Sequence, residues 1–367
     1  MEKLIYQIAI TQIKGVGNIT AKTLLAHVGS IEDIFKQSRS QLLKIPNIGE
    51  FLVAQLNKER DNAFRRAEKE LEFITKHNIT PLFFTDDAYP YRLKECDDAP
   101  IIVYTKGNQD FNAGRFVGIV GTRKLTDYGK TQCQKLITEF SQRNITIVSG
   151  LAYGADICAH KAALEQGLNT VGVLGHGLDR IYPDLHRSTA ARMLSQGALL
   201  TEYPSGTNPD KQNFVQRNRI IAGLVDALVV VESAARGGSL ITAEVANSYN
   251  RDVFAFPGRT SDEFSAGCNA LIRENKAALI ENAADLEKMM GWEQSAKNKH
   301  IIEPMIFAEL SEEEKQILTL IKTPEGLHIN QIAIKMEKPV SRIASRLIEM
   351  EFKGLVKPLP GSMYKGI

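Results

Sequence analysis

Between about residue 113 and residue 290, short apolar runs alternate with stretches whose apolar positions recur every three to four residues. The short runs predict strands and the periodic stretches predict helices. We expect strands at 116–120, 145–148, 170–174, 198–202, 228–231 and 253–256. We expect the intervening helices at 127–143, 155–166, 188–195, 214–223 and 238–249. Uninterrupted apolar strands are typical of a parallel sheet covered on both faces, so the pattern predicts a doubly wound, Rossmann-like α/β domain.

Residues 61–112 extend this domain toward the N-terminus. A charged helix is expected over 61–76, followed by two short strands at 81–84 and 101–104 that we assign to the same sheet. The complete α/β domain is therefore predicted to span residues 61–290.

Residues 1–60 contain only helical patterns, with two similar glycine turns. Gly15-Val16-Gly17 precedes a helix at 20–28, and Asn47-Ile48-Gly49 precedes a helix at 50–58. This arrangement resembles a tandem helix-hairpin-helix domain, in which the N–H groups of a helix start bind DNA phosphates. The alternative is a helical protein-interaction module whose glycines only terminate helices.

The C-terminal region has a different organisation. Residues 291–304 are polar and aperiodic, as in a linker. Three helices, expected at 311–322, 329–336 and 340–352, and a strand-like tail then predict a winged helix over 305–367. Arg342, Ser345 and Arg346 share one face of the third helix and could enter a DNA groove. However, the segment has nine basic and eight acidic residues, so duplex DNA and another protein both remain possible partners.

Composition restricts the function only weakly. The chain has 367 residues and a formal net charge of +2, so any anion site must be built locally. Its four cysteines are widely scattered, which argues against a zinc or redox pair and fits the cytoplasm. We expect neither a signal peptide nor a membrane span.

The loop after the first central strand, Gly121-Thr122-Arg123, offers the clearest chemistry. Ligands bind doubly wound sheets at the carboxyl ends of the strands, and this loop can present N–H groups, a hydroxyl and a guanidinium to a phosphate. The dinucleotide fingerprint is incomplete because its third glycine and its ribose-binding acid are missing, so NAD is not expected. Gly129-Lys130-Thr131 falls within a helical pattern, which argues against an ATP-binding loop.

Three further segments could bind phosphates. They are Ser149-Gly150 after the second strand, Arg217-Asn218-Arg219 on a helix, and Gly237-Gly238-Ser239 at a helix start. Arg217 and Arg219 diverge by about 200° on a helix, so one would face the site while the other pairs with an acid or reaches a flanking phosphate. Several anion sites without an acid–base or metal motif favour a protein that follows a single strand of DNA or RNA. We expect no catalytic residue, metal or cofactor.

The motifs together resemble the DNA-processing protein A (DprA, or Smf) family of bacteria. The stretches that carry the resemblance are 118–123 (GIVGTR), 148–164 (VSGLAYGADICAHKAAL), 177–183 (GLDRIYP), 217–224 (RNRIIAGL), 229–233 (VVVES), 237–243 (GGSLITA), 253–258 (VFAFPG) and 267–272 (GCNALI). They cover nearly the whole central domain.

The resemblance implies a non-catalytic protein that binds single-stranded DNA, protects incoming strands in natural transformation and helps to load the recombinase RecA. Arg123 corresponds to the family's phosphate-binding arginine and 217–219 to its Arg-Asn-Arg segment. The resemblance also implies a homodimer formed around 263–282, where the apolar residues are Phe264, Leu271, Ile272, Leu279 and Ile280.

One enzymatic alternative stays open. Residues 236–244 share a glycine pair and Glu244 with the motif of phosphoribohydrolases, which belong to the same broad superfamily. A nucleotide-binding N-glycosidase is therefore the second hypothesis.

Overall fold

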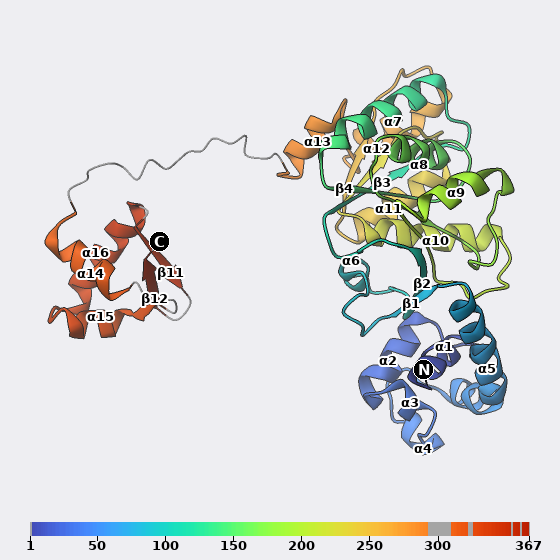
Figure 1. Cartoon of the computed structure of the whole chain (residues 1–367), viewed down its shortest axis with the longest axis horizontal. Helices are drawn as coiled ribbons and strands as arrows, with labels where there is room; N and C mark the ends of the chain where they lie inside the picture. Colours follow the sequence, from blue (N-terminus) through green and yellow to red (C-terminus); the bar gives the residue numbers. More distant parts are fainter. Residues whose placement is uncertain (1, 293–309, 322–325, 354, 360–361, 367) are drawn as a thin grey trace. The chain divides into compact units, whose positions relative to one another are not determined.

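The computed structural model describes residues 2–292, 310–321, 326–353, 355–359 and 362–366 (Figure 1). The chain divides into two compact units, Met1–Glu293 and Gln294–Ile367. Beyond residue 292, the linker expected at 291–304 lies outside the described residues.

A mixed sheet forms the centre of the first unit. Within the described residues its nine strands have the order β1-β2-β6-β5-β4-β3-β7-β8-β9. From β6 through β5, β4, β3, β7 and β8 to β9, each strand pairs with the next in parallel. Strand β1 pairs antiparallel with β2, and β2 pairs antiparallel with β6. The strands are β1 (Thr80–Phe83), β2 (Ile102–Gly107), β3 (Arg115–Val120), β4 (Ile145–Ser149), β5 (Thr170–Val173), β6 (Gly197–Thr201), β7 (Ala227–Val230), β8 (Asp252–Ala255) and β9 (Ala278–Leu279).

Helices cover both faces of this sheet, as the apolar strands predicted. Along β3, Phe116 and Val120 belong to one buried cluster, while Val117 and Ile119 belong to the other, as the two-residue period of a strand requires. The first cluster includes residues of α6 (Tyr91–Lys94), α10 (Lys211–Leu224), α11 (Gly238–Ser248) and α12 (Ala266–Arg273). The second includes residues of α7 (Asp127–Glu139), α8 (Ala155–Glu165) and α13 (Ala283–Met289), and α9 (Arg187–Met193) packs beside α8. The doubly wound fold is confirmed.

The N-terminal helices lie at the β1–β2 end of this unit (blue in Figure 1). They are α1 (Glu2–Thr11), α2 (Asn18–Val28), α3 (Ile31–Ile34), α4 (Arg39–Leu42) and α5 (Glu50–Lys76). Their buried side chains share one cluster with Ile101, Ile102 and Tyr104 from the edge of the sheet.

Helix α5 corrects one sequence prediction. It is a single 27-residue helix, whereas we expected two helices, at 50–58 and 61–76. The polar residues 57–62 suggested a break, but they include neither glycine nor proline. Leu56, Ala63, Ala67 and Ile74 are buried, so the helical spacing of core residues continues across the polar stretch.

The second unit has the predicted winged-helix order. Its helices are α14 (Glu312–Leu320), α15 (Ile329–Lys335) and α16 (Val340–Phe352), and its strands are β10 (Leu327–His328), β11 (Val356–Leu359) and β12 (Met363–Gly366). A capping box begins α14, because Ser311 accepts the N–H of Glu314 and the Glu314 carboxylate accepts the N–H of Ser311. Strand β10 was not predicted.

No helix in the described part of the chain is both long and apolar enough to cross a membrane. No group of three or more His, Cys, Asp or Glu side chains there is arranged to hold a metal ion.

Candidate nucleic-acid interface

A groove lies at the carboxyl ends of β3 and β7. Strand β3 pairs with β4 on one side and β7 on the other, so the order of the sheet reverses here, and such a switch point is where open α/β sheets bind ligands. Loops after β3 and β4, helix α10 and the start of α11 line the groove. Four of its lining residues are basic, Arg123, Lys211, Arg217 and Arg236, and one is acidic, Asp156. This balance of charges favours an anionic ligand.

The loop after β3 is held by its own backbone. The Thr122 N–H donates to the carbonyl of Glu232 at 2.8 Å, and the Thr122 carbonyl accepts the N–H of Ala155 at 3.1 Å. The Thr122 hydroxyl accepts the N–H of Lys124. The Thr122 N–H is therefore already used within the protein and is not one of the N–H groups that can bind a phosphate. Gly121 lines the groove, and the loop offers a ligand mainly the Thr122 hydroxyl and the Arg123 side chain.

Arg123 is exposed and lines the groove. Its guanidinium has no hydrogen-bond or ion-pair partner among the residues that the structure describes, whereas many other arginines of this unit are ion-paired. An unpaired guanidinium in a cationic groove is well suited to bind a phosphate. Arg123 thus lies in the groove, and its binding of a phosphate stays a prediction.

Arg217 and Asp156 meet below the groove. Nη1 of Arg217 donates to the carbonyl of Val173 at 2.7 Å, and its Nε has no partner among the described residues. Burial raises the pKa of Asp156, while the positive charge of Arg217 opposes this shift. Burial likewise lowers the pKa of Arg217, and Asp156 opposes that shift. Arg217 therefore lines the groove while its guanidinium is held by the Val173 carbonyl, with the charge of Asp156 nearby.

Ser149 and Gly150 do not form the expected anion site. Ser149 is fully buried and its hydroxyl donates to the carbonyl of Ile119 at 2.5 Å. Gly150 is also buried, and a Cβ there would overlap both the Arg217 guanidinium and the Asp156 carboxylate. The prediction failed because the end of β4 is covered by Arg217. Gly150 makes room for that pair.

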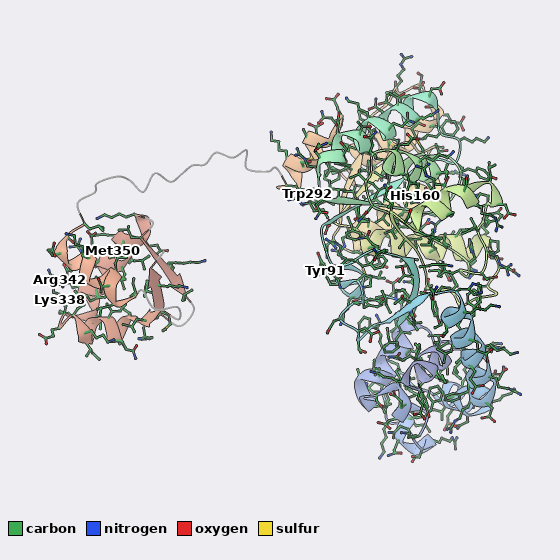
Figure 2. All side chains as sticks on the ribbon, in the orientation of Figure 1. Tyr91, His160, Trp292, Lys338, Arg342 and Met350 are labelled. Carbon is green, nitrogen blue, oxygen red and sulfur yellow. The ribbon has the colours of Figure 1, made fainter. Side chains whose placement is uncertain are left out.

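His160, labelled in Figure 2, is a core residue of the α/β domain. It is fully buried, and its Nε2–H donates to the carbonyl of Gly150. Burial lowers the pKa of His160 to about 4, so the ring is neutral near pH 7.

The other residues of the Arg-Asn-Arg segment separate as helical geometry requires. Asn218 is half-buried and lines the groove. Arg219 lies on another face of α10, where it forms ion pairs with Glu202 and Asp98 and donates to the Asp98 carbonyl at 2.9 Å. Phosphate binding by Arg219 is therefore corrected to a structural role. Asn18 also donates to Glu202, so this cluster joins α10 to the N-terminal helices.

The start of α11 supplies a second part of the groove. Gly237, Gly238 and Ser239 line it beside Arg236, and Gly238 is exposed. The N–H of Gly237 donates to the Ala234 carbonyl, and the Ser239 hydroxyl donates to Ser233 at 2.9 Å. Those two groups are therefore not the phosphate donors that we expected. The first N–H groups of a helix have no intrahelical acceptor, so the N-terminus of α11 is suited to an anion, and phosphate binding there stays a prediction.

Sequence reasoning missed an aromatic pocket that adjoins the groove. Tyr153, Tyr182 and Phe214 line it, with Arg123 and Arg217 at the boundary shared with the groove. The rings of Tyr182 and Phe214 stack with centroids 5.7 Å apart, although the residues are distant in sequence. Tyr153 and Tyr182 are about half exposed, at 47% and 49%. Tyr153 and Tyr182 stand in loops that follow strands, which could have suggested a binding role. Their proximity to Phe214 of α10 is visible only in the folded structure.

Two of the proposed dimer residues belong to the core. Leu271 and Ile280 are 5% and 0% exposed, so they are corrected to core positions. Leu279 is exposed in the edge strand β9, and Phe264 and Ile272 are half-buried. These three residues remain available to a partner.

The winged helix also departs from expectation. Three cations, Lys338, Arg342 and Arg346, form ion pairs with Glu313 of α14. Lys338 and Arg342 lie on neighbouring parts of this unit (Figure 2). Arg342 and Arg346, which could enter a DNA groove, are therefore partly neutralised within the unit.

Comparison with known proteins identifies the family. Residues 80–291 match the family model described as DNA recombination-mediator protein A. The chain belongs to the DNA recombination-mediator protein A family. Residues 304–362 match the DprA winged helix domain, and residues 8–59 match the SAM-like helix-hairpin-helix tandem.

Individual family members support this assignment. Protein Smf of Synechocystis sp. is 32% identical over 395 residues, which cover 98% of each chain. The chain is also similar to the X-ray structure of DNA processing protein A from Streptococcus pneumoniae, with 33% sequence identity and a TM-score of 0.65. The match covers 77% of this chain and 97% of the Streptococcus chain. The Helicobacter pylori DNA processing protein A, whose structure is described as showing a single-stranded DNA binding mode, covers 58% of this chain and 95% of its own, with 28% identity and a TM-score of 0.53.

Proposed function

We propose that the groove binds single-stranded DNA. The observation that carries the proposal is the unpaired Arg123 side chain, which lies between a cationic groove and an aromatic pocket. Phosphates require the first feature and unstacked bases favour the second. The single-stranded DNA binding mode described for the Helicobacter pylori relative supports the same ligand class here.

We propose a different role for the groove and for the pocket. Arg123, Lys211, Arg236 and the N-terminus of α11 bind the backbone phosphates, while Arg217 adds a buried positive charge. The pocket of Tyr153, Tyr182 and Phe214 stacks against a base. Bases in a duplex already stack on each other and face their partners, so a single strand reaches this pocket at a lower free-energy cost.

We infer that the protein binds the strand without cutting it. Asp156 is the one acid among the described groove-lining residues, and its carboxylate is buried against Arg217. Glu244, the residue shared with phosphoribohydrolases, is exposed and lies outside the groove lining. Neither acid is placed for general acid–base chemistry on a ligand in the groove.

Family membership supports the wider role. We propose that the protein acts in the cytoplasm as a homodimer, protects incoming single strands during natural transformation and assists the loading of RecA on them. Phe264, Ile272 and Leu279 are the surface residues that we assign to the dimer contact. Light scattering that shows only a 40.7 kDa monomer at micromolar concentration would contradict the dimer.

A binding titration with four ligands tests the proposed function. Fluorescence anisotropy would compare a labelled oligothymidylate, the matching duplex, and competition by inorganic phosphate and by nucleoside monophosphates. We expect the single strand to bind most tightly and the small anions to compete weakly. Release of free base from a nucleoside monophosphate would instead support the N-glycosidase, and tighter binding of the duplex would contradict the proposal.

A further inference from the structure

Glu232 follows β7 and lies outside the groove lining, with 3% of its surface exposed. Its carboxylate accepts two hydrogen bonds from Thr126, one from the N–H at 2.9 Å and one from the hydroxyl at 2.5 Å. Its carbonyl accepts the N–H of Thr122 at 2.8 Å. One buried residue therefore holds both ends of the segment 122–126, which carries Arg123.

The surroundings of the carboxylate fit this arrangement. Thr126 is the N-cap of α7, and its Oγ1 accepts the N–H of Gly129 at 3.2 Å. The Glu232 carboxylate thus lies at the N-terminus of a helix, where a negative charge is stabilised. A Cβ at Gly129 would overlap Oε2 of Glu232, so the glycine leaves the space that the carboxylate occupies.

We propose that Glu232 is a positioning residue for DNA binding, acting through the segment 122–126 to hold Arg123 over the groove. A binding loop that is already ordered loses less conformational entropy when the ligand arrives. The inference rests on the proposed function, because it requires Arg123 to contact the strand. Glu232 would thus support DNA binding without contacting the strand, although it is negatively charged like the phosphates.

A double-mutant cycle tests the coupling between Glu232 and Arg123. Single-stranded DNA affinity is measured for the wild type, Glu232→Ala, Arg123→Ala and the double variant. We expect Glu232→Ala to weaken binding at least about threefold in the wild type and to have little effect once Arg123 is absent. An equal loss in both backgrounds, or no loss in either, would overturn the proposal. If Arg123→Ala alone leaves the affinity unchanged, the proposed function fails instead.

Two milder variants separate positioning from misfolding. Thr126→Val removes one hydrogen bond to the carboxylate, and Thr131→Val is its control, because Thr131 donates only to the Asp127 carbonyl of its own helix. Gly129→Ala favours the helix by its intrinsic propensity but displaces Glu232. We expect Thr126→Val and Gly129→Ala to weaken binding in a folded protein and Thr131→Val to leave it unchanged.

The conservative variant provides a rescue. Glu232→Gln keeps an acceptor for the Thr126 N–H and places a donor against its hydroxyl, so we expect most of the binding to be retained. Binding by Glu232→Gln that is as weak as that of Glu232→Ala would overturn the positioning role. Binding clearly tighter than that of the wild type would do so too, because it would show that the carboxylate acts by repelling the strand.

Discussion

Arg219 and Glu202 form an ion pair of 2.5 Å that joins helix α10 to the N-terminal helices through Asn18. The two side chains are 16% and 11% exposed, and Arg219 also pairs with Asp98. Arg217, two residues earlier, lines the groove. One turn of α10 therefore carries both an arginine that connects it to the N-terminal helices and an arginine that lines the groove.

Arg219→Ala should lower stability without removing a phosphate contact. Breaking a largely buried pair leaves Glu202 without its main counter-charge, and we expect a loss of about 3 kcal/mol in the free energy of unfolding. Urea denaturation measures this loss, and a DNA titration at several salt concentrations measures the phosphate contacts. A stable variant with a reduced salt dependence would show that Arg219 binds DNA after all.

Arg123→Ala should have the opposite profile. Because its guanidinium has no partner among the described residues, the free energy of unfolding should be unchanged. The slope of log affinity against log salt should fall in magnitude by about 0.7, as expected for one phosphate of a single strand. Lys124→Ala is the matched control, since Lys124 is exposed in the same loop but does not line the groove. Equal effects of the two substitutions would contradict a specific contact.

Phe214→Ala should weaken binding by about 1–3 kcal/mol, the usual contribution of one stacked base. The salt slope should stay at the wild-type value, because no charge is removed. Tyr91→Ala provides a control, since Tyr91 is 44% exposed and lies outside both the pocket and the groove (Figure 2). Tight binding by Phe214→Ala would mean that the aromatic pocket does not hold a base.

His160 should make the protein less stable in acid. Its folded pKa of about 4 lies below the ordinary value of 6.5, so between these values the unfolded chain binds a proton that the folded chain does not. Stability is therefore complete above pH 6.5 and falls by up to about 3 kcal/mol as the pH approaches 4. His160→Gln should flatten this dependence in urea denaturation, whereas His27→Gln, at an exposed position, should not. Identical pH profiles for both variants would assign the acid sensitivity to other groups.

Glu313→Ala should increase the affinity of the winged helix for duplex DNA. The substitution frees Arg342 from its ion pair with Glu313 and leaves Arg346 paired with Glu349 alone. Glu312→Ala removes the same charge from a neighbouring position that pairs with Lys315, and it serves as the control. A gain of affinity specific to Glu313→Ala would show that α16 can bind DNA, whereas equal small gains would favour a protein partner.

The sequence predicted the sheet well because its strands are continuous apolar runs, and the position of Arg123 followed from the end of the first central strand. The prediction that Ser149 binds an anion was wrong, because a serine at a strand end can equally donate a hydrogen bond inside the core. Ser149 donates to the carbonyl of Ile119. The local sequence pattern also does not show which face of α10 points toward the groove. It therefore predicted that one of Arg217 and Arg219 would face the site, but not which one. Tyr182 and Phe214 come together through tertiary packing, which no local spacing encodes.

The unbroken helix α5 has a consequence for how the chain can be divided. At 27 residues it is about 40 Å long, and it continues through the position where a pattern-based boundary would place a cut. Starting a shortened protein at residue 61 would split this helix and uncover Ile101, Ile102 and Tyr104 beside the edge of the sheet. An exposed apolar patch of this kind favours aggregation. The N-terminal helices therefore cover apolar residues of the α/β domain, and a truncation that keeps this cover would remove only residues after 292.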